Sequence, residues 1–263
     1  AYKLGEPVDT LLLYQIPRNS RLTPFVGREQ ELASIYQTWS ASKNHQCIMV
    51  KGEAGVGKTR LIFECTQLDK MASAARINLQ CSQLHQNSAL FPVISYLQHV
   101  LKLDDSGDGS RASSKLGRFL RENDCDTSEV HGALASLLGI DMDGNPVNTM
   151  QPQDRRRSYF TAIEQLLESE QRKGDLLIIV EDIQWIDPTT YQLLRQITGS
   201  ETALFRTMIV TARPEFELDA ELAPGCSVVE LAPLSSELSE SMVKSVFTGE
   251  PVEQSVIKEI VDV

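Results

Sequence analysis

The chain has 263 residues, of which 41% are hydrophobic and 23% charged, a composition typical of a globular protein large enough for one α/β domain with flanking pieces. Its 36 acidic and 25 basic residues give a net charge of -11, so the basic footprint that usually accompanies nucleic-acid binding is missing. We therefore predict that this segment contacts neither DNA nor RNA.

The cysteines and the apolar runs indicate the cellular environment. Five cysteines are present, an odd number without the spacing of a metal or redox motif, so reduced thiols are expected. The longest aliphatic run, residues 176–180, is much too short to span a bilayer, and the N-terminus lacks the apolar segment of a signal peptide. We expect a cytoplasmic location and no membrane contact.

Both ends of the sequence read as parts of larger units. Residues 1–24 hold a strand-like run and a polar connector, which is typical of the end of a preceding domain and a linker. Residues 25–232 are expected to form the main domain, and residues 233–263 to begin a small helical lid subdomain. Helical spacing of apolar residues continues to the last positions without a stop signal, at Val256, Ile257, Ile260 and Val261.

Short apolar runs alternate with helical patterns between these ends. Strands are predicted at residues 47–50, 75–79, 176–180, 207–211 and 227–231. Helices are predicted at residues 59–71, 90–103 and 155–170, and a further helix is expected to open at Pro188 with Asp187 as its cap. The polar, glycine-rich residues 104–114 are expected to form a mobile loop.

The pattern of these elements predicts the fold class. Residues 176–180 are aliphatic without alternation, which suits a strand covered on both faces of a parallel sheet. Strands separated by helices favour an α/β fold in three layers, with a parallel sheet of about five strands.

One loop carries a pattern with a specific chemical meaning. A Gly-x4-Gly-Lys-Thr sequence lies between the first predicted strand and the first predicted helix. In such a loop, backbone N–H groups wrap the phosphates, the lysine adds a positive charge between the β- and γ-phosphates, and the hydroxyl binds Mg²⁺. The candidate binding residues are Gly52, Glu53, Ala54, Gly55, Val56, Gly57, Lys58, Thr59 and Arg60. The sequence therefore predicts a site for a nucleoside triphosphate with magnesium.

Acidic and polar residues follow two of the other strands. Glu181 and Asp182 end the strand at 176–180, where buried carboxylates are costly unless they meet a cation. We assign Glu181 to the magnesium shell and Asp182 to polarising the attacking water, and the reverse assignment stays open. Thr211 and Arg213 are candidates for contact with the γ-phosphate, against the alternative that they bond only locally.

Four segments in this order resemble the signal-transduction ATPases with numerous domains, called STAND, an AAA+-like branch of the P-loop proteins. They are Thr-Pro-Phe-Val-Gly-Arg-Glu-Gln-Glu-Leu at 23–32, Gly-Glu-Ala-Gly-Val-Gly-Lys-Thr-Arg at 52–60, Ile-Val-Glu-Asp-Ile-Gln-Trp-Ile-Asp-Pro at 179–188 and Val-Thr-Ala-Arg-Pro-Glu at 210–215. The chain is most similar to the ATPase module that follows the catalytic domain in many class III adenylyl cyclases, and residues 4–9 resemble the closing segment of such a cyclase domain. Related modules occur in large transcriptional regulators with helical repeats.

The resemblance implies ligands and partners. In the family, the segment matching Val26, Gly27 and Arg28 lies against the adenine, and ATP or ADP with Mg²⁺ is the bound cofactor. No Asn-Lys-x-Asp guanine-reading motif is present, which favours ATP over GTP. The implied partners are a cyclase-like domain upstream, helical repeats downstream, and further copies in a nucleotide-dependent oligomer.

Three functions are compatible with these motifs. The first is a regulatory switch within a multidomain signalling protein, with slow ATP hydrolysis as its reset. The second is an ATP-driven motor with fast turnover, and the third is a nucleotide-stabilised scaffold or the ATPase module of a STAND transcriptional regulator. The sequence shows neither a pore-loop signature nor a second substrate pocket, so we rank the switch first. Cyclase activity is not expected, because residues 1–24 are too few to hold such an active site.

Overall fold

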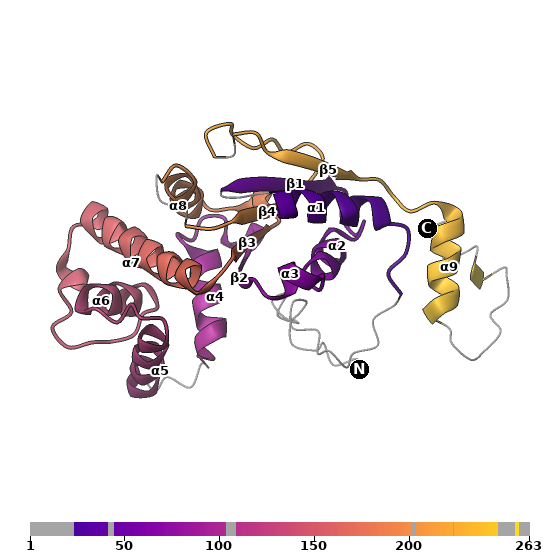
Figure 1. Ribbon diagram of the computed structural model, residues 1–263. Helices are drawn as coiled ribbons and strands as arrows, with labels where there is room; N and C mark the ends of the chain where they lie inside the picture. The colour runs from indigo at the N-terminus through magenta and orange to yellow at the C-terminus, as the bar shows by residue number, and fades with distance from the viewer. Residues whose placement is uncertain are drawn as a thin grey trace, which may run out of the picture.

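A parallel five-stranded sheet forms the middle layer of the protein in a computed structural model, which describes residues 24–41, 45–103, 109–200, 204–222, 224–246 and 256–257 (Figure 1). The strands are β1 (Gln46–Gly52), β2 (Ala75–Gln80), β3 (Leu176–Glu181), β4 (Thr207–Ala212) and β5 (Ser227–Leu231). Their order across the sheet is β2-β3-β4-β1-β5, and every neighbouring pair is parallel. All five predicted strands are confirmed, as is the three-layer α/β fold class.

Helices α1 (Glu29–Ala41), α2 (Lys58–Cys65) and α3 (Asp69–Ala72) cover one face of this sheet. Their buried side chains include Ile35 and Trp39 of α1 and Leu61 of α2, and they form one core cluster with the sheet. Helix α1 begins two residues after Gly27. The start of the described chain lies next to the loop that follows β1, because Arg28 donates to the Val56 carbonyl of that loop.

The opposite face is covered by α4 (Phe91–Leu101), α7 (Pro152–Lys173) and α8 (Pro188–Thr198). Two further helices, α5 (Gly109–Glu122) and α6 (Ser128–Leu137), pack beside α4 and α7 rather than on the sheet. Short 3₁₀ turns connect these elements at η2 (Gln83–His85), η3 (Pro146–Thr149) and η4 (Ile183–Trp185).

The central strand β3 shows why an unbroken aliphatic run was needed. Leu177 and Ile179 pack with the core on the α1–α3 side, while Ile178 and Val180 pack with the core on the α4–α8 side. Because successive side chains of a strand point to opposite faces, both sets are buried only when helices cover both faces. The burial expected from the sequence is confirmed.

Two expectations about local structure are wrong. The helix predicted at 59–71 is divided into α2 and α3, because the Thr66 hydroxyl donates to the Phe63 carbonyl at 2.7 Å and Leu68 takes an extended conformation (φ -76°, ψ 126°). Residues 109–114, expected in a mobile loop, belong to α5, whose burial of Leu116 and Leu120 one turn apart anchors the helix. The rest of that expected loop, residues 104–108, lies outside the described residues.

The predicted helix cap at Asp187 is confirmed. Its carboxylate accepts hydrogen bonds from the backbone N–H groups of Thr189 at 3.0 Å and Thr190 at 2.9 Å, at the start of α8. It also accepts from the Leu90 N–H at 3.0 Å, so this buried side chain connects the start of α8 to the start of α4.

The last described helix, α9 (Ser236–Val246), follows β5 through a short connector. Gly27 lies against it so closely that a Cβ there would be 2.6 Å from Leu238 Cδ1 and 3.2 Å from Leu234 Cδ2. Residues 256–257 are helical, whereas the strand-like run expected within 1–24 and the end of the helical pattern beyond 257 lie outside the described residues. Within the described part of the chain, no helix has both the length and the apolar character needed to cross a bilayer.

Candidate functional site

The loop between β1 and α2 has the geometry of an anion cradle. Gly55 and Gly57 have φ angles of 77° and 98°, a region that glycine enters at little cost and that turns successive N–H groups toward one concave side. The helix α2 begins at Lys58, directly after the loop, so its unpaired N–H groups and the positive end of its dipole lie at the same place.

Lys58 lies inside this loop rather than in solvent. It is 8% exposed, and its Nζ donates to the carbonyl oxygens of Gly52 at 2.7 Å and Glu53 at 2.8 Å. Burial is the main cause that lowers the pKa of Lys58 and Arg213 adds to it, while Asp182, Glu53 and Glu181 oppose it. Because the net effect is a lowered pKa, a further anion in the cradle would stabilise the buried ammonium.

The two acids at the end of β3 take different positions. Glu181 is 3% exposed and accepts a hydrogen bond from the Thr59 hydroxyl, so the two groups expected around a magnesium ion are in direct contact. Asp182 follows in a left-handed conformation (φ 53°, ψ 47°), and its backbone N–H donates to Thr211 Oγ1 at 2.8 Å. This bond ties the end of β3 to the end of β4.

An open pocket of about 400 Å³ lies at the carboxyl ends of these strands. It is lined by Ala54, Gly55, Gly57, Lys58, Thr59, Arg60, Phe63, Asp182 and Arg213. All of these except Phe63 are sequence-predicted candidates, so segments far apart in the chain meet at one cavity. Glu181 and Thr211 lie directly behind the lining, through their bonds to Thr59 and Asp182.

Phe63 was missed by the sequence reasoning. It sits on α2 one turn after Thr59, a spacing that places both side chains on the same side of a helix. An apolar residue at this spacing from Thr59, the predicted magnesium ligand, was the available signal. Its ring also lies 6.0 Å from the guanidinium of Arg60, which in turn pairs with Glu64 at 2.6 Å.

The donor set at the pocket suits magnesium rather than a metal held by protein alone. Among the described residues no group of three or more His, Cys, Asp or Glu side chains is arranged to hold a metal ion. Mg²⁺ commonly takes only one or two protein ligands and completes its shell with water and phosphate oxygens. The Thr59 hydroxyl and the Glu181 carboxylate, already side by side, fit that requirement.

The remaining charged candidate, Arg213, reaches the loop from the end of β4. Its guanidinium lies 3.7 Å from the Glu53 carboxylate and also lines the pocket. The positive charge of Arg213 therefore lies at the same pocket as Lys58.

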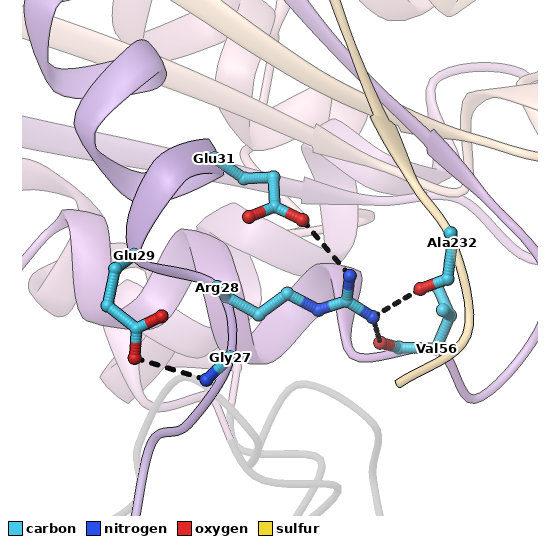
Figure 2. Close-up of polar contacts among 6 residues, drawn as sticks. All are labelled: Gly27, Arg28, Glu29, Glu31, Val56 and Ala232. Carbon is cyan, nitrogen blue, oxygen red and sulfur yellow. Dashed lines mark hydrogen bonds and ion pairs between the residues drawn. The ribbon is translucent and has the colours of Figure 1, made fainter. Parts of the chain in front are cut away.

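Val26, Gly27 and Arg28, the residues for which the family resemblance implies contact with adenine, do not line the pocket around Lys58. The Arg28 guanidinium donates to the Ala232 carbonyl at 2.5 Å and the Val56 carbonyl at 3.4 Å, and pairs with Glu31 at 3.0 Å (Figure 2). The side chain therefore joins the loop after β1 to the connector after β5, and its contact with adenine stays a prediction.

Comparison with known proteins places this site in a family context. A family model described as an AAA ATPase domain matches residues 24–210. An uncharacterized protein of Rhizobium meliloti (strain 1021) is 26% identical over 225 residues, covering 84% of this chain and 22% of the relative, so the chain spans about a fifth of that protein.

Two solved structures were compared as well. The crystal structure of Cdc6p from Pyrobaculum aerophilum aligns with a TM-score of 0.55 and 13% identity, over 97% of this chain and 58% of that chain, and this supports the fold alone. A STAND protein with a tetratricopeptide repeat sensor from Pyrococcus horikoshii aligns with a TM-score of 0.40 and 16% identity, over 94% of this chain and 29% of that one. A score that low supports no inference about this chain.

Proposed function

Because this chain belongs to the AAA ATPase domain family, whose members in general use a nucleotide and Mg²⁺, we propose that it binds ATP or ADP with Mg²⁺ in the pocket between α2 and the ends of β3 and β4. The observation that carries the proposal is the meeting of Lys58, Thr59 and Asp182 around one cradle of backbone N–H groups.

Each group around the pocket has a role in this binding. The N–H groups of the loop and of the first turn of α2 surround the β- and γ-phosphates, and Lys58 exchanges its two carbonyl partners for phosphate oxygens. Thr59 binds the metal directly, and Glu181 holds a water of the metal shell. Arg213 contacts the γ-phosphate from the β4 side.

The placement of Asp182 supports a role in hydrolysis. Its carboxylate lines the pocket, whereas Glu181 is turned toward Thr59, so Asp182 is the group available to orient an attacking water. Thr211 lies behind the pocket lining and accepts the Asp182 N–H, so its role in this proposal is to position Asp182. We assign Asp182 to water activation and Glu181 to the metal.

We place this chemistry in a regulatory switch within a larger protein. The Rhizobium relative is several times longer than the matched region, which fits a module that acts on other domains. The resemblance of the four sequence segments to STAND modules behind class III cyclase domains suggests an upstream cyclase-like domain, downstream helical repeats and nucleotide-dependent oligomerisation. The hydrogen bonds of Arg28 connect the phosphate loop to the segment that leads into α9, so a change in nucleotide occupancy can alter the position of α9.

Calorimetry on the full-length protein tests the binding. MgATP and MgADP should bind the native protein, and Lys58→Met should weaken the affinity by at least tenfold because a charge-assisted hydrogen bond to phosphate is lost. Lys115→Met removes the same charge from α5, away from the pocket, and should leave the affinity unchanged. Absence of binding heat with the native protein at millimolar ligand would overturn the proposal.

Steady-state hydrolysis separates the three functions. A switch predicts a slow rate that Asp182→Asn abolishes while nucleotide binding persists; asparagine tolerates the left-handed backbone at this position. Glu181→Gln should instead raise the magnesium concentration needed for half-maximal binding. Many turnovers per second would indicate a motor, and tight binding without any turnover would indicate a scaffold.

A further inference from the structure

Two cysteines face each other at the start of neighbouring strands, far from the nucleotide pocket. Ile48 of β1 is paired with Ser227 of β5, so the preceding residues, Cys47 and Cys226, are opposite each other. Both pack against the core on the α4–α8 side of the sheet, and each thiol shifts the pKa of the other. They are separated by almost the whole domain in sequence, which is why no spacing motif revealed them.

The backbone already has the separation that a disulfide needs. Adjacent strands lie about 4.8 Å apart, and disulfides join residues whose Cα atoms are roughly 4.4–6.8 Å apart. Both side chains pack on the same face of the sheet, one residue before the first paired residues of β1 and β5, so this register is compatible with a sulfur–sulfur bond.

The two thiols differ in the way that an attacking and a resolving cysteine differ. Cys226 is half-buried and its Sγ donates to the Ser227 carbonyl at 3.7 Å, while its interactions with Cys47 and with the Met49 backbone lower its pKa against the opposing effect of burial. Cys47 is 4% exposed, and its pKa is raised by its interaction with Cys226 and by burial. Reagents in solution therefore meet Cys226 first, in its more reactive form.

The other cysteines lack these properties. Cys65, Cys81 and Cys125 are all buried, and in each case burial raises the pKa. They serve as internal controls, since a reaction driven merely by cysteine content would involve them too.

We propose that Cys47 and Cys226 form a reversible intrachain disulfide by exchange with a low-molecular-weight disulfide such as oxidised glutathione. The Cys226 thiolate attacks one sulfur of glutathione disulfide and releases one glutathione thiolate, forming a mixed disulfide. Cys47 then loses its proton to solvent, attacks the Cys226 sulfur and releases the second glutathione as a thiolate. Both cysteines are oxidised and one glutathione disulfide is reduced to two thiols. The new bond attaches β5, the edge strand, covalently to β1.

The test is incubation of the folded full-length protein with oxidised glutathione, followed by thiol counting and mass spectrometry of the intact chain. We expect the loss of two thiols and two hydrogen atoms, no retained glutathione, and a peptide pair joining Cys47 to Cys226. Cys47→Ala should instead stop at the mixed disulfide and retain one glutathione on Cys226. Cys226→Ser should lose no thiol, and Cys125→Ser should behave like the native chain.

Three outcomes would overturn the proposal. They are a stable glutathione adduct on Cys226 of the native chain, a bond that involves Cys65, Cys81 or Cys125, and no thiol loss in the native chain. Circular dichroism of each variant before oxidation establishes that the variant is folded. If Cys47→Ala fails to fold, the half-buried Cys226→Ser still decides the result, because it alone should abolish thiol loss.

Discussion

The replacement of Arg28 by methionine separates a structural role from the base contact implied by family resemblance. Methionine keeps much of the length and apolar stem of arginine but removes all donors. The change deletes the 2.5 Å bond to Ala232 and the weaker 3.4 Å bond to Val56, and it leaves Glu31 without its 3.0 Å partner. These three contacts hold together the loop after β1, the start of α1 and the connector to α9.

The size of the effect follows from these contacts. A hydrogen bond from a charged donor contributes about 1.5–3 kcal/mol, and both carbonyl bonds of Arg28 are partly buried. The ion pair with the partly exposed Glu31 adds roughly 0–1 kcal/mol. We expect Arg28→Met to lower the free energy of unfolding by about 2–4 kcal/mol, which is a fall in Tm of about 5–15 °C for a domain of this size.

Thermal unfolding without nucleotide, followed by circular dichroism, measures this difference. Glu31→Gln is the matched control, because it removes the ion pair but keeps both carbonyl bonds, and it should cost about 1 kcal/mol or less. The reasoning is refuted if Arg28→Met leaves the Tm within about 1 °C of the native value. A simultaneous loss of preference for ATP over GTP would show that the guanidinium acts on the base instead.

Three further predictions address other parts of the structure. Thr59→Val should raise the Mg²⁺ concentration needed for half-maximal MgATP binding by at least tenfold in a titration with Mg²⁺. Thr59→Ser keeps the hydroxyl and should keep the native value. The same Mg²⁺ requirement in both variants would show that Thr59 does not bind the metal. The pKa of Lys58 is lowered in the absence of ligand, and a bound phosphate raises it again, so MgATP binding should take up protons increasingly as the pH rises toward 9. Calorimetry in buffers of different ionisation heat measures this proton uptake. Lys58→Arg should abolish the uptake, and proton release on binding would contradict the prediction. Asp187→Ala should lower the free energy of unfolding by about 2–4 kcal/mol in denaturant, since it removes a helix cap and leaves the Leu90 N–H unpaired. Asp187→Asn keeps one acceptor oxygen and should lower it less. Equal decreases in both variants would indicate that the charge of Asp187 matters rather than its hydrogen bonds.

Much of the fold could be predicted from local patterns. Each strand is a short apolar run, and the central one, β3, shows by its unbroken aliphatic sequence that both faces are covered. The cap at Asp187 was visible because an acid followed by proline is a local signal. The order of the strands was not predictable, because it depends on contacts between segments more than a hundred residues apart.

The errors and omissions have physical reasons as well. Residues 109–114 are mostly small and polar, and the packing of Leu116 and Leu120 in the core stabilises the helix that contains them. The break between α2 and α3 comes from one hydroxyl, that of Thr66, which competes with the helix for a carbonyl.

The candidate site divides along the same line. The cradle and the metal-side residues could be read from the sequence, because phosphate chemistry fixes their types and spacing. The two backbone carbonyls that bind Arg28 could not be predicted, since every residue type has such an acceptor. For the same reason, the pairing of Cys47 with Cys226 became visible only once β1 and β5 were neighbours.

The strand order also governs how the molecule can be made. Gln46 of β1 is paired with Thr207 of β4, so about 160 further residues must be synthesised before β1 can pair with β4. At 5–20 residues per second that delay is about 10–30 s. During it the aliphatic side chains of β1 and the unpaired edges of the strand are exposed at the ribosome. The phosphate cradle at the end of β1 is thus among the last parts to be completed, and nascent chains of this protein are exposed to chaperones or self-association before a nucleotide can stabilise them.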